Sequence, residues 1–408
     1  MASTQKSRDA KGIELRINET GDILRRALQT VLNELPVRSA GPQALANQIN
    51  VDKVFASRLL KAMRAPDAMS LMHRIPGPEP LRRFLRAASR RGIDRPVAEA
   101  AERAVDQFAS LIRDELGDRA ALSAILSAWV PEARRELELR NKQAAFKAIS
   151  QLKGVWAEGI LATAILSPSA DAGRLDLVWI SGLIGLRRLH PRASVKLATR
   201  RMVRNDDGRH PQTLDGRRSE GMQNALLEEF SSSPPPALEV HRVGEVVHYT
   251  WAACGFGPAS ATDFVVAEVN RSEMRRFIGA HEKRKGFAFA EVSVPAKALQ
   301  FDTIVHRDVY PGAHPTLRIY DTALEGVADI NDPARDIDLL ATTETIESLG
   351  EGVERIGSST VPRYGDLIAH VCGRLHWDRS EFRAYRCQID YPLYGAQVAM
   401  CFDPPREP

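Results

Sequence analysis

Basic and small polar side chains recur at helical spacing between residues 52 and 64. If this stretch is a helix, one face carries them together with little acidic charge. Guanidinium and ammonium groups form charge-assisted hydrogen bonds to phosphate oxygens and to the acceptor edges of bases. The spacing therefore predicts a surface that binds a DNA duplex, with base contacts from Lys53, Val54, Ser57 and Arg58 and phosphate contacts from Lys61 and Arg64.

Two short helices joined by a tight turn would hold this face outward. Asn50 lies where the turn needs a residue that tolerates positive φ, and Asp52 begins the second helix. The small residues Ala46 and Ala56 would let the two helices cross closely at a steep angle. The apolar spacing predicts the inner surface, with Leu45, Ala46 and Ile49 in the first helix, Val51 in the turn, and Ala56 and Leu59 in the second helix.

The stretch GPQALANQINVDKVFASRLLKAMR, residues 41–64, resembles the helix-turn-helix of bacterial transcriptional regulators in general. The resemblance covers roughly residues 20–65, and no named family is identified for the rest of the chain. It implies a helical DNA-binding domain, double-stranded DNA as a partner, and a homodimer that reads two half-sites. Many members have glycine where this chain has Asn50, which tolerates the same backbone conformation. Within this motif Gln43, on the first helix, is a further predicted DNA contact.

Positive charge is concentrated around this motif. Between Arg38 and Arg91 the chain has eleven Lys or Arg residues and three Asp or Glu residues, a net charge of +8, whereas the whole chain carries +4. A basic module on a mildly acidic body is typical of proteins that contact phosphate. Arg82, Arg83 and Arg86 lie on a predicted helix that ends near Arg91 and are candidates for a phosphate clamp; the alternative is a merely solvated helix face.

The composition is that of an ordinary soluble globular protein, with 44% apolar and 26% charged residues among 408. This length suffices for two or three domains. No run of about twenty apolar residues is present, so no transmembrane helix is expected, and the polar start MASTQKSRDAKG does not match a signal peptide. The four cysteines form no CxxC pair, which favours a cytoplasmic protein with reduced thiols.

Hydrophobic periodicity divides the chain into four segments. The sequence predicts a disordered tail at 1–12, a helix-turn-helix domain at 13–92, long helices at 93–153, and an α+β effector or partner-binding region at 154–408. The third segment is expected to hold one long amphipathic helix and a second helical stretch from 119 to 153. The first of these has an apolar stripe, Val97, Ala101, Val105, Phe108 and Ile112, that is a candidate seam for a homodimer. The alternative is that the stripe packs inside its own subunit.

Short β-branched and apolar runs replace the helical periodicity after Gly154. Strands are expected at about 160–166, 175–180, 195–199, 239–251, 263–269, 287–294, 299–306, 316–320, 383–391 and 397–402. Helices are expected near 219–230, 271–284, 337–349 and 363–375. This mixture predicts an α+β arrangement rather than regular βαβ alternation, and the polar segment 204–236 marks a possible division of the region.

The sequence contains no motif of an easily identified enzyme class. The patterns GxxxxGK[ST], GxSxG, HExxH and paired CxxC are all missing. Two sets of residues could ligate a metal if they converged: His306 with Asp308 and His314, and Cys372 with His376, Cys387 and Cys401. Strand-end, turn and core positions explain both sets more simply, so no metal, cofactor or catalytic residue is assigned.

The sequence thus predicts a DNA-binding transcriptional regulator whose α+β region senses a small-molecule effector or binds a protein partner, with no membrane association. Two alternatives come from other classes. One is an enzyme that its basic module docks on nucleic acid or on an acidic partner. The other is a helical interaction module that binds proteins and no DNA. A closed polar cleft with convergent titratable groups would favour the enzyme, and exposed apolar residues on the 52–64 helix would favour the interaction module.

Overall fold

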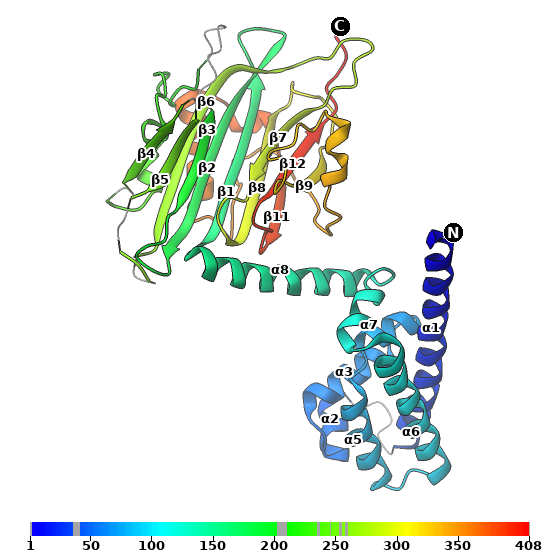
Figure 1. Ribbon diagram of the computed structural model, residues 1–408. Coiled ribbons are helices and arrows are strands. Elements are labelled where there is room, and N and C mark those ends of the chain that lie inside the picture. Colours follow the sequence, from blue (N-terminus) through cyan, green and yellow to red (C-terminus); the bar gives the residue numbers. More distant parts are fainter. Residues whose placement is uncertain are drawn as a thin grey trace. The chain divides into compact units, whose positions relative to one another are not determined.

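The computed structural model describes residues 2–35, 41–201, 210–234, 237–244, 246–252, 255–257 and 260–407. The chain forms two compact units, Met1–Glu138 and Leu139–Pro408. The first is helical and the second combines helices with large sheets, which confirms the predicted order of an α-helical part followed by a mixed part (Figure 1). No helix in the described ranges combines the length and the apolar character that crossing a bilayer requires.

Helices make up the first unit. They are α1 (Ala2–Glu34), α2 (Pro42–Ile49), α3 (Lys53–Met63), α4 (Ala68–Arg74), α5 (Pro78–Ser89), α6 (Arg95–Ser110) and α7 (Arg119–Leu126), and a π-helical turn at Leu111–Leu116 follows α6. Local chemistry explains where they begin. Pro78 is the first residue of α5, where a missing N–H is tolerated, and the Asp67 carboxylate caps α4 by accepting a 2.7 Å hydrogen bond from the Ser70 N–H.

Helix α1 is longer than the sequence predicts. It begins at Ala2, so it includes most of the segment 1–12 for which the sequence predicts a tail. The later turns of α1 are anchored because Ile17, Leu24 and Leu28 have no exposed surface. Extending an existing helix adds one hydrogen bond for each residue fixed, and the Ala, Lys, Arg and Gln residues of this segment favour helix.

The apolar stripe of α6 is buried within one chain. Ala101, Val105 and Phe108 have no exposed surface, and they belong to the core that α6 forms with α1 and α5. Val97 and Ile112 are half-buried against the same core. The prediction that this stripe forms the seam of a dimer is therefore wrong. An apolar stripe shows that a helix has a buried face, but its width and spacing do not show whether the covering element comes from the same chain.

The helix predicted from 119 to 153 is two helices. Helix α7 ends at Leu126, and α8 spans Pro131–Lys153, so Pro131 begins a helix instead of lying inside one. Proline inside a helix removes a backbone hydrogen bond and clashes with the preceding turn, whereas the first position accepts it. Gly154, with φ +66°, ends α8 at a point where a Cβ atom would lie 2.1 Å from Nε2 of His190. The unit boundary after Glu138 assigns the second half of α8 to the second unit.

A six-stranded sheet forms the centre of the second unit, in the order β10-β11-β8-β1-β2-β6 (Figure 1). Neighbouring strands are antiparallel except for β1 and β8, which run parallel. Gly182 lets β2 approach β6 closely, because a Cβ at this position would lie 2.7 Å from the carbonyl oxygen of Phe264. The strands are β1 (Val155–Pro168), β2 (Arg174–Arg188), β6 (Thr262–Arg275), β8 (Ala296–His306), β10 (Glu347–Glu351) and β11 (Phe382–Asp390).

Two smaller sheets pack on one face of the large sheet. One has the order β3-β5-β4 and the other the order β7-β12-β9. Their strands are β3 (Lys196–Arg201), β4 (Leu238–Val243), β5 (Val246–Trp251), β7 (Gly286–Glu291), β9 (Thr316–Asp321) and β12 (Ala396–Phe402). A shared core joins both to the large sheet, with Tyr249 from β5, Met400 from β12 and Phe301 from β8.

The opposite face of the large sheet is covered by α9 (Tyr364–Leu375). Leu367, Ile368 and Val371 of α9 pack in one core with Ile165 of β1 and Val178 of β2. The second unit therefore has three layers: the two small sheets, the large sheet, and a helix. Strands β1 and β2 are apolar on both faces because both faces are covered.

The predicted strands are confirmed, and the run expected at 239–251 is the β4-β5 hairpin. Of the four predicted helices, the one at 363–375 is confirmed as α9. The other three are wrong: 219–230 contains two 3-10 turns, 271–275 belongs to β6, and 337–349 runs from a 3-10 turn into β10. Short stretches with helical spacing take the conformation that pairing with a neighbouring strand imposes, because tertiary contacts outweigh local propensity.

The possible division at 204–236 is not found. Residues 202–209 and 235–236 lie outside the described residues. The backbone amides of Gln212, Leu227 and Ser232 donate hydrogen bonds to carbonyl oxygens of β6, at Val269, Val265 and Asp263. The described part of this segment thus runs along the terminal strand of the large sheet and belongs to the same unit.

Candidate functional site

The turn between α2 and α3 has the backbone geometry that the sequence predicts. Asn50 adopts φ 54° and ψ 55°, the left-handed conformation. Asp52 caps α3, because its carboxylate accepts hydrogen bonds from the N–H groups of Val54 at 2.8 Å and Phe55 at 3.1 Å. A capping aspartate stabilises a helix by about 1 kcal/mol. The first turn of α3, which carries Lys53 and Val54, is therefore held in place.

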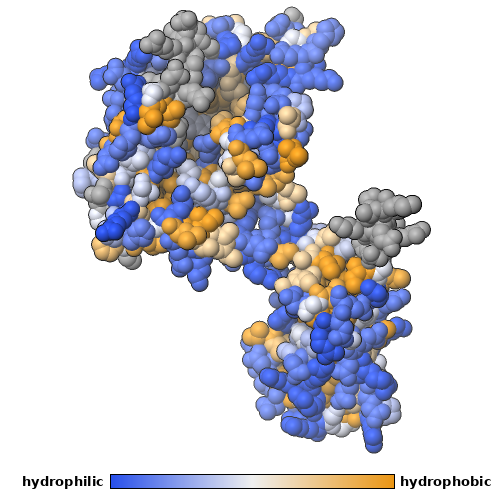
Figure 2. Space-filling view, in the orientation of Figure 1, coloured by the Kyte–Doolittle hydropathy of each residue, from blue (hydrophilic) through white to orange (hydrophobic). Residues whose placement is uncertain are grey.

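Helix α3 presents a basic face to solvent. Lys53, Arg58, Lys61 and Arg64 are exposed, and within the described ranges no ion pair or side-chain hydrogen bond engages them. Val54 is 67% exposed and Ser57 is half-buried, whereas the opposite side of the helix buries Ala56, Leu59 and Ala62. All six predicted contact positions thus lie away from the core, in a unit whose visible surface is largely hydrophilic (Figure 2).

The half-buried Arg119 lies within electrostatic reach of Arg58 on α3. Nη2 of Arg119 donates to the carbonyl oxygens of Met72, His73 and Ile75, at 2.9, 3.2 and 3.2 Å, and so satisfies the end of α4. Burial lowers the pKa of Arg119 to about 10, and the positive charge of Arg58 lowers it in the same direction. The group stays protonated at neutral pH, so its positive charge adds to the electrostatic field around Arg58.

The predicted phosphate clamp on α5 is only partly available. The guanidinium of Arg82 is held by Glu79 at 2.6 Å and by Asp106 at 2.8 Å. Arg83 and Arg86 are exposed. Helix α5 contacts α3 through Phe84 and Phe55, whose ring centroids lie 5.9 Å apart. On α2 the remaining predicted contact, Gln43, is exposed and donates a 2.9 Å hydrogen bond to Oδ1 of Asn47.

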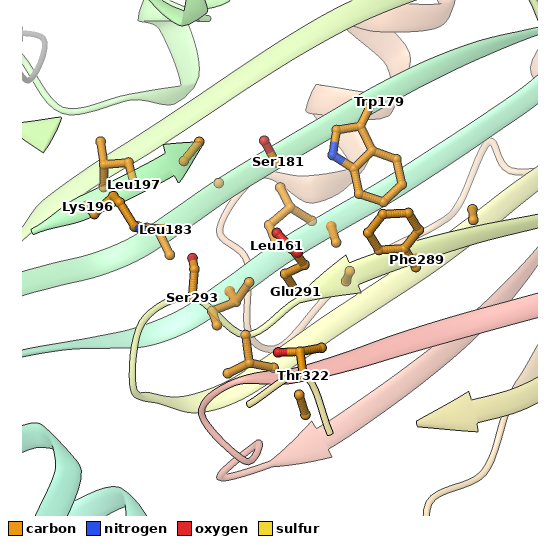
Figure 3. Close-up of a pocket in the computed structure, with 18 of the residues that line it drawn as sticks. Leu161, Trp179, Ser181, Leu183, Lys196, Leu197, Phe289, Glu291, Ser293 and Thr322 are labelled. Carbon is orange, nitrogen blue, oxygen red and sulfur yellow. The ribbon is translucent and has the colours of Figure 1, made fainter. Parts of the chain in front are cut away.

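The second unit contains a groove of about 660 Å³ that the sequence analysis did not predict (Figure 3). Its floor is the face of β1 and β2, and its sides are β3 and β7. The volume lies within the range of small-molecule and peptide sites. Apolar side chains dominate the lining, among them Ala162, Leu177, Trp179, Leu183 and Phe289, and polar groups come from Ser181, Lys196, Glu291, Ser293 and Thr322.

Glu291 and Lys196 are the charged side chains of this lining. Partial burial raises the pKa of the Glu291 carboxyl, and the charge of Lys196 opposes that rise. The two side chains lie on opposite sides of the groove, and each keeps contact with solvent. The groove was missed because its residues come from strands far apart in the sequence. The one local signal is a lone acid in the apolar run FAFAEVSV, residues 287–294.

The two histidine and cysteine sets do not converge. Within the described residues no group of three His, Cys, Asp or Glu side chains is placed to hold a metal ion. His306 pairs with Glu381 at 3.2 Å, and His314 makes an edge-to-face contact with Tyr385, with ring centroids 5.7 Å apart. The thiols of Cys372, Cys387 and Cys401 are buried, and burial raises their pKa values to about 11, 12 and 11, so they are neutral at pH 7. His376 ends α9, and Cys254 lies outside the described residues.

Comparison with known proteins gives no relative: no family model matches the chain, and no curated protein and no solved structure matches it. Two local features of the described structure therefore bear on function. These are the outward face of α3 in the first unit and the groove between β3 and β7 in the second.

Proposed function

We propose that this protein is a sequence-specific DNA-binding transcriptional regulator in which α2, the turn at Asn50 and α3 act as a helix-turn-helix. The observation that carries the proposal is the outward face of α3. It has four exposed cations without ion pairs among the described residues, on a helix whose first turn Asp52 caps. The major groove of B-DNA, about 12 Å wide, admits an α-helix, and cations without internal partners are available to displace phosphate counterions.

Position along α3 assigns the roles in this proposal. The first half of a recognition helix enters the groove, so Lys53, Val54, Ser57 and Arg58 meet base edges. A guanidinium can donate two hydrogen bonds to O6 and N7 of guanine, and this contact suits Arg58. Phosphates are bound by side chains around this helix, namely Gln43, Lys61, Arg64, Arg83 and Arg86. Arg82 adds to the positive field but contributes less, because Glu79 and Asp106 already bind it.

The exposed surface of α3 favours DNA over a protein partner. Val54 is its one large apolar side chain with more than a third of its surface exposed in the described structure, and four exposed cations lie on the same helix. Helices that dock into protein grooves present several apolar anchors at helical spacing. The groove of the second unit also differs from the closed polar cleft that would favour an enzyme, since its lining is mainly apolar.

The test uses the full chain and duplexes selected by it from a random pool. Arg58→Ala is expected to weaken binding to the selected site by roughly 1–3 kcal/mol and to relax base preference. Lys61→Ala is expected to weaken all sequences about equally and to lower the slope of log K against log salt by about 1. Arg103→Ala removes an exposed charge from α6 and serves as the control. If both α3 variants bind like the control in mobility-shift titrations, α3 is not a recognition helix.

In the same proposal the protein is cytoplasmic and forms a homodimer. Its second unit binds a small-molecule effector or a protein partner. Two motifs on a twofold axis would read half-sites about 34 Å apart. The buried stripe of α6 is excluded as the interface, so the dimer uses another surface. Light scattering of the full chain at micromolar concentration, with and without the selected duplex, decides between monomer and dimer. A monomer in both states would remove the dimer from the proposal.

A further inference from the structure

The two small sheets of the second unit each end in an unpaired strand at the groove. Strand β3 is the first strand of β3-β5-β4, and β7 is the first strand of β7-β12-β9. Among the described strands, β3 pairs with β5 alone and β7 with β12 alone. Each therefore turns one row of backbone N–H and C=O groups away from its own sheet. Such edges bind further strands unless something covers them.

These two edges face each other across the groove. Residues 196–198 of β3 and 287–291 of β7 line its two sides (Figure 3). Lys196 lies on one edge and Glu291 on the other, and the positive charge of Lys196 acts to lower the pKa of the Glu291 carboxyl. Between them Leu177, Trp179 and Ser181 on the face of the large sheet are only half-buried. The small sheets thus form one interrupted layer above a continuous floor.

We propose that this groove binds an extended peptide segment, which adds a strand between β3 and β7 and joins the two small sheets. Backbone groups of the peptide would pair with both edges, and this pairing supplies affinity that is independent of peptide sequence. Successive side chains of a strand point to opposite faces. Every second residue of the peptide therefore lies on the apolar floor and is apolar, while the alternate residues face solvent and are polar.

Charge complementarity defines the ligand further. An acidic residue of the peptide is favoured next to Lys196 on one side, and a basic residue is favoured next to Glu291 on the other. Strands β3 and β7 are both six residues long, Lys196–Arg201 and Gly286–Glu291. At about 3.3 Å per residue, a peptide of about six residues covers either edge. This inference gives the effector of the proposed regulator a chemical class, but it concerns the second unit alone.

An unpaired strand edge is not by itself sufficient to bind a peptide, as the outer edge of β4 shows. It is the other terminal strand of the same small sheet, and five of its six residues are exposed. A peptide there would gain one row of hydrogen bonds and no apolar floor. An isolated pair of strands is marginally stable in water, so binding needs the second edge and the floor that the groove provides.

Fluorescence anisotropy of labelled peptides with the full chain tests the proposal. The probes are hexapeptides that alternate Val and Thr and carry one Glu and one Lys in either order along the chain. The matched control peptides have the same side chains but N-methyl groups on alternate amides, which removes the hydrogen bonds to one edge. We expect saturable binding of a probe, weakened about tenfold or more by N-methylation.

Two protein variants locate the site. Ser181 is half-buried on the floor, where Ser181→Trp would fill the groove, and Ser181→Ala is its matched control. We expect Ser181→Trp to weaken probe binding about tenfold or more and Ser181→Ala to leave it within about twofold. Hydrogen exchange with the probe is expected to slow at 196–198 and 287–291 and to stay unchanged in β4. Circular dichroism checks that Ser181→Trp folds, and Leu177→Trp, at another half-buried residue of the floor, replaces it if it does not.

The results separate this inference from the proposed function. The proposal is overturned if no probe saturates, if N-methylated peptides bind equally well, or if exchange slows at β4 instead of at the groove. Equal binding of N-methylated peptides would mean that the floor takes apolar side chains or compact apolar molecules. None of these measurements involves DNA, so peptide binding by a chain that fails the mobility-shift test would support the groove and reject the regulator.

Discussion

Asp302 is a carboxylate with no exposed surface, and its partners come from three elements. Arg386 of β11 binds it twice, with Nε to Oδ1 at 2.8 Å and Nη2 to Oδ2 at 2.7 Å. Nε2 of Gln300 donates a third hydrogen bond at 3.1 Å. Burial, helped by the Asp302 charge, raises the pKa of Tyr364 on α9 well above its ordinary value. One buried charge pair thus ties β8, β11 and α9 together.

Breaking this pair is expected to destabilise the second unit strongly. Asp302→Ala leaves the Arg386 guanidinium, 14% exposed, without its carboxylate, and loss of one partner of a buried pair costs about 3–5 kcal/mol. The double variant Asp302→Leu with Arg386→Met replaces both charges by apolar groups and is expected to be more stable than either single variant. Urea unfolding of the parent, Asp302→Leu, Arg386→Met and the double variant measures this, and additive effects of the two substitutions would contradict a coupled pair.

His73 links the stability of the helical unit to pH. Its side chain is 10% exposed and lies 3.4 Å from the carboxylate of Glu136. Burial lowers the pKa of His73 below 6.5, against the opposing effect of Glu136. The unfolded chain therefore binds a proton at a higher pH than the folded chain does. As pH falls below about 6.5 the unfolded state gains protons first, so the free energy of unfolding decreases until pH passes the folded pKa.

The variant His73→Gln is expected to show a shallower decrease of unfolding free energy than the parent between pH 7 and pH 5. Urea unfolding at several pH values measures the difference. His281→Gln, at an exposed histidine of the second unit, is the control and should follow the parent. A steeper decrease in His73→Gln would mean that the sign of the pKa shift is wrong.

Helix α8 is the element that joins the two units, and its second half belongs to the sheet unit. The ring of Phe146 packs against Tyr391 and Trp156, with centroids 5.3 and 5.9 Å away. Lys142 forms an ion pair with Glu344, and both side chains are mostly buried. A fragment that begins at Gly154, where helical periodicity gives way to predicted strands, would lose these contacts. The domain boundary is therefore the unit boundary at residue 139.

We expect the fragment 139–408 to be more stable than the fragment 154–408, in the same buffer and by the same urea titration. In the full chain Phe146→Ala is expected to cost about 1–3 kcal/mol, because the side chain is half-buried. Leu152→Ala changes an 85% exposed residue of the same helix and should cost close to nothing. Equal stability of the two fragments would show that α8 packs on the sheet without stabilising it.

At the scale of the whole molecule, each unit has its own hydrophobic core. Phe84 lies in the core of the helical unit and Phe301 in the core of the sheet unit, both with no exposed surface. Separate cores predict separate cooperative transitions on heating. Phe84→Ala and Phe301→Ala are each expected to cost about 3–5 kcal/mol and to lower one transition while leaving the other unchanged. Scanning calorimetry checks this, and a single transition lowered by both variants would mean that the chain unfolds as one body.

Local chemistry made the α3 region predictable. The turn at Asn50, the cap at Asp52 and the outward basic positions follow from φ preference, side-chain hydrogen bonding and a period of 3.6 residues, all of which act within one or two turns of chain. The strands of the second unit were likewise recognised from β-branched and apolar runs. The ion pair of Arg82 could not be predicted from local chemistry, because its partner Asp106 lies 24 residues away in the sequence.

Contacts between residues far apart in the sequence decided the remaining features of the fold and of the groove. The sequence by itself determined that the chain has an α-helical part followed by a mixed part, where most strands lie, and which face of α3 is basic. Only the tertiary structure showed that Phe108 is covered by its own chain, that 219–230 runs along β6, and that β3 and β7 border one groove. Periodicity reports that a face is buried or a strand is extended, but the element that covers or pairs with it is chosen by contacts between residues distant in sequence.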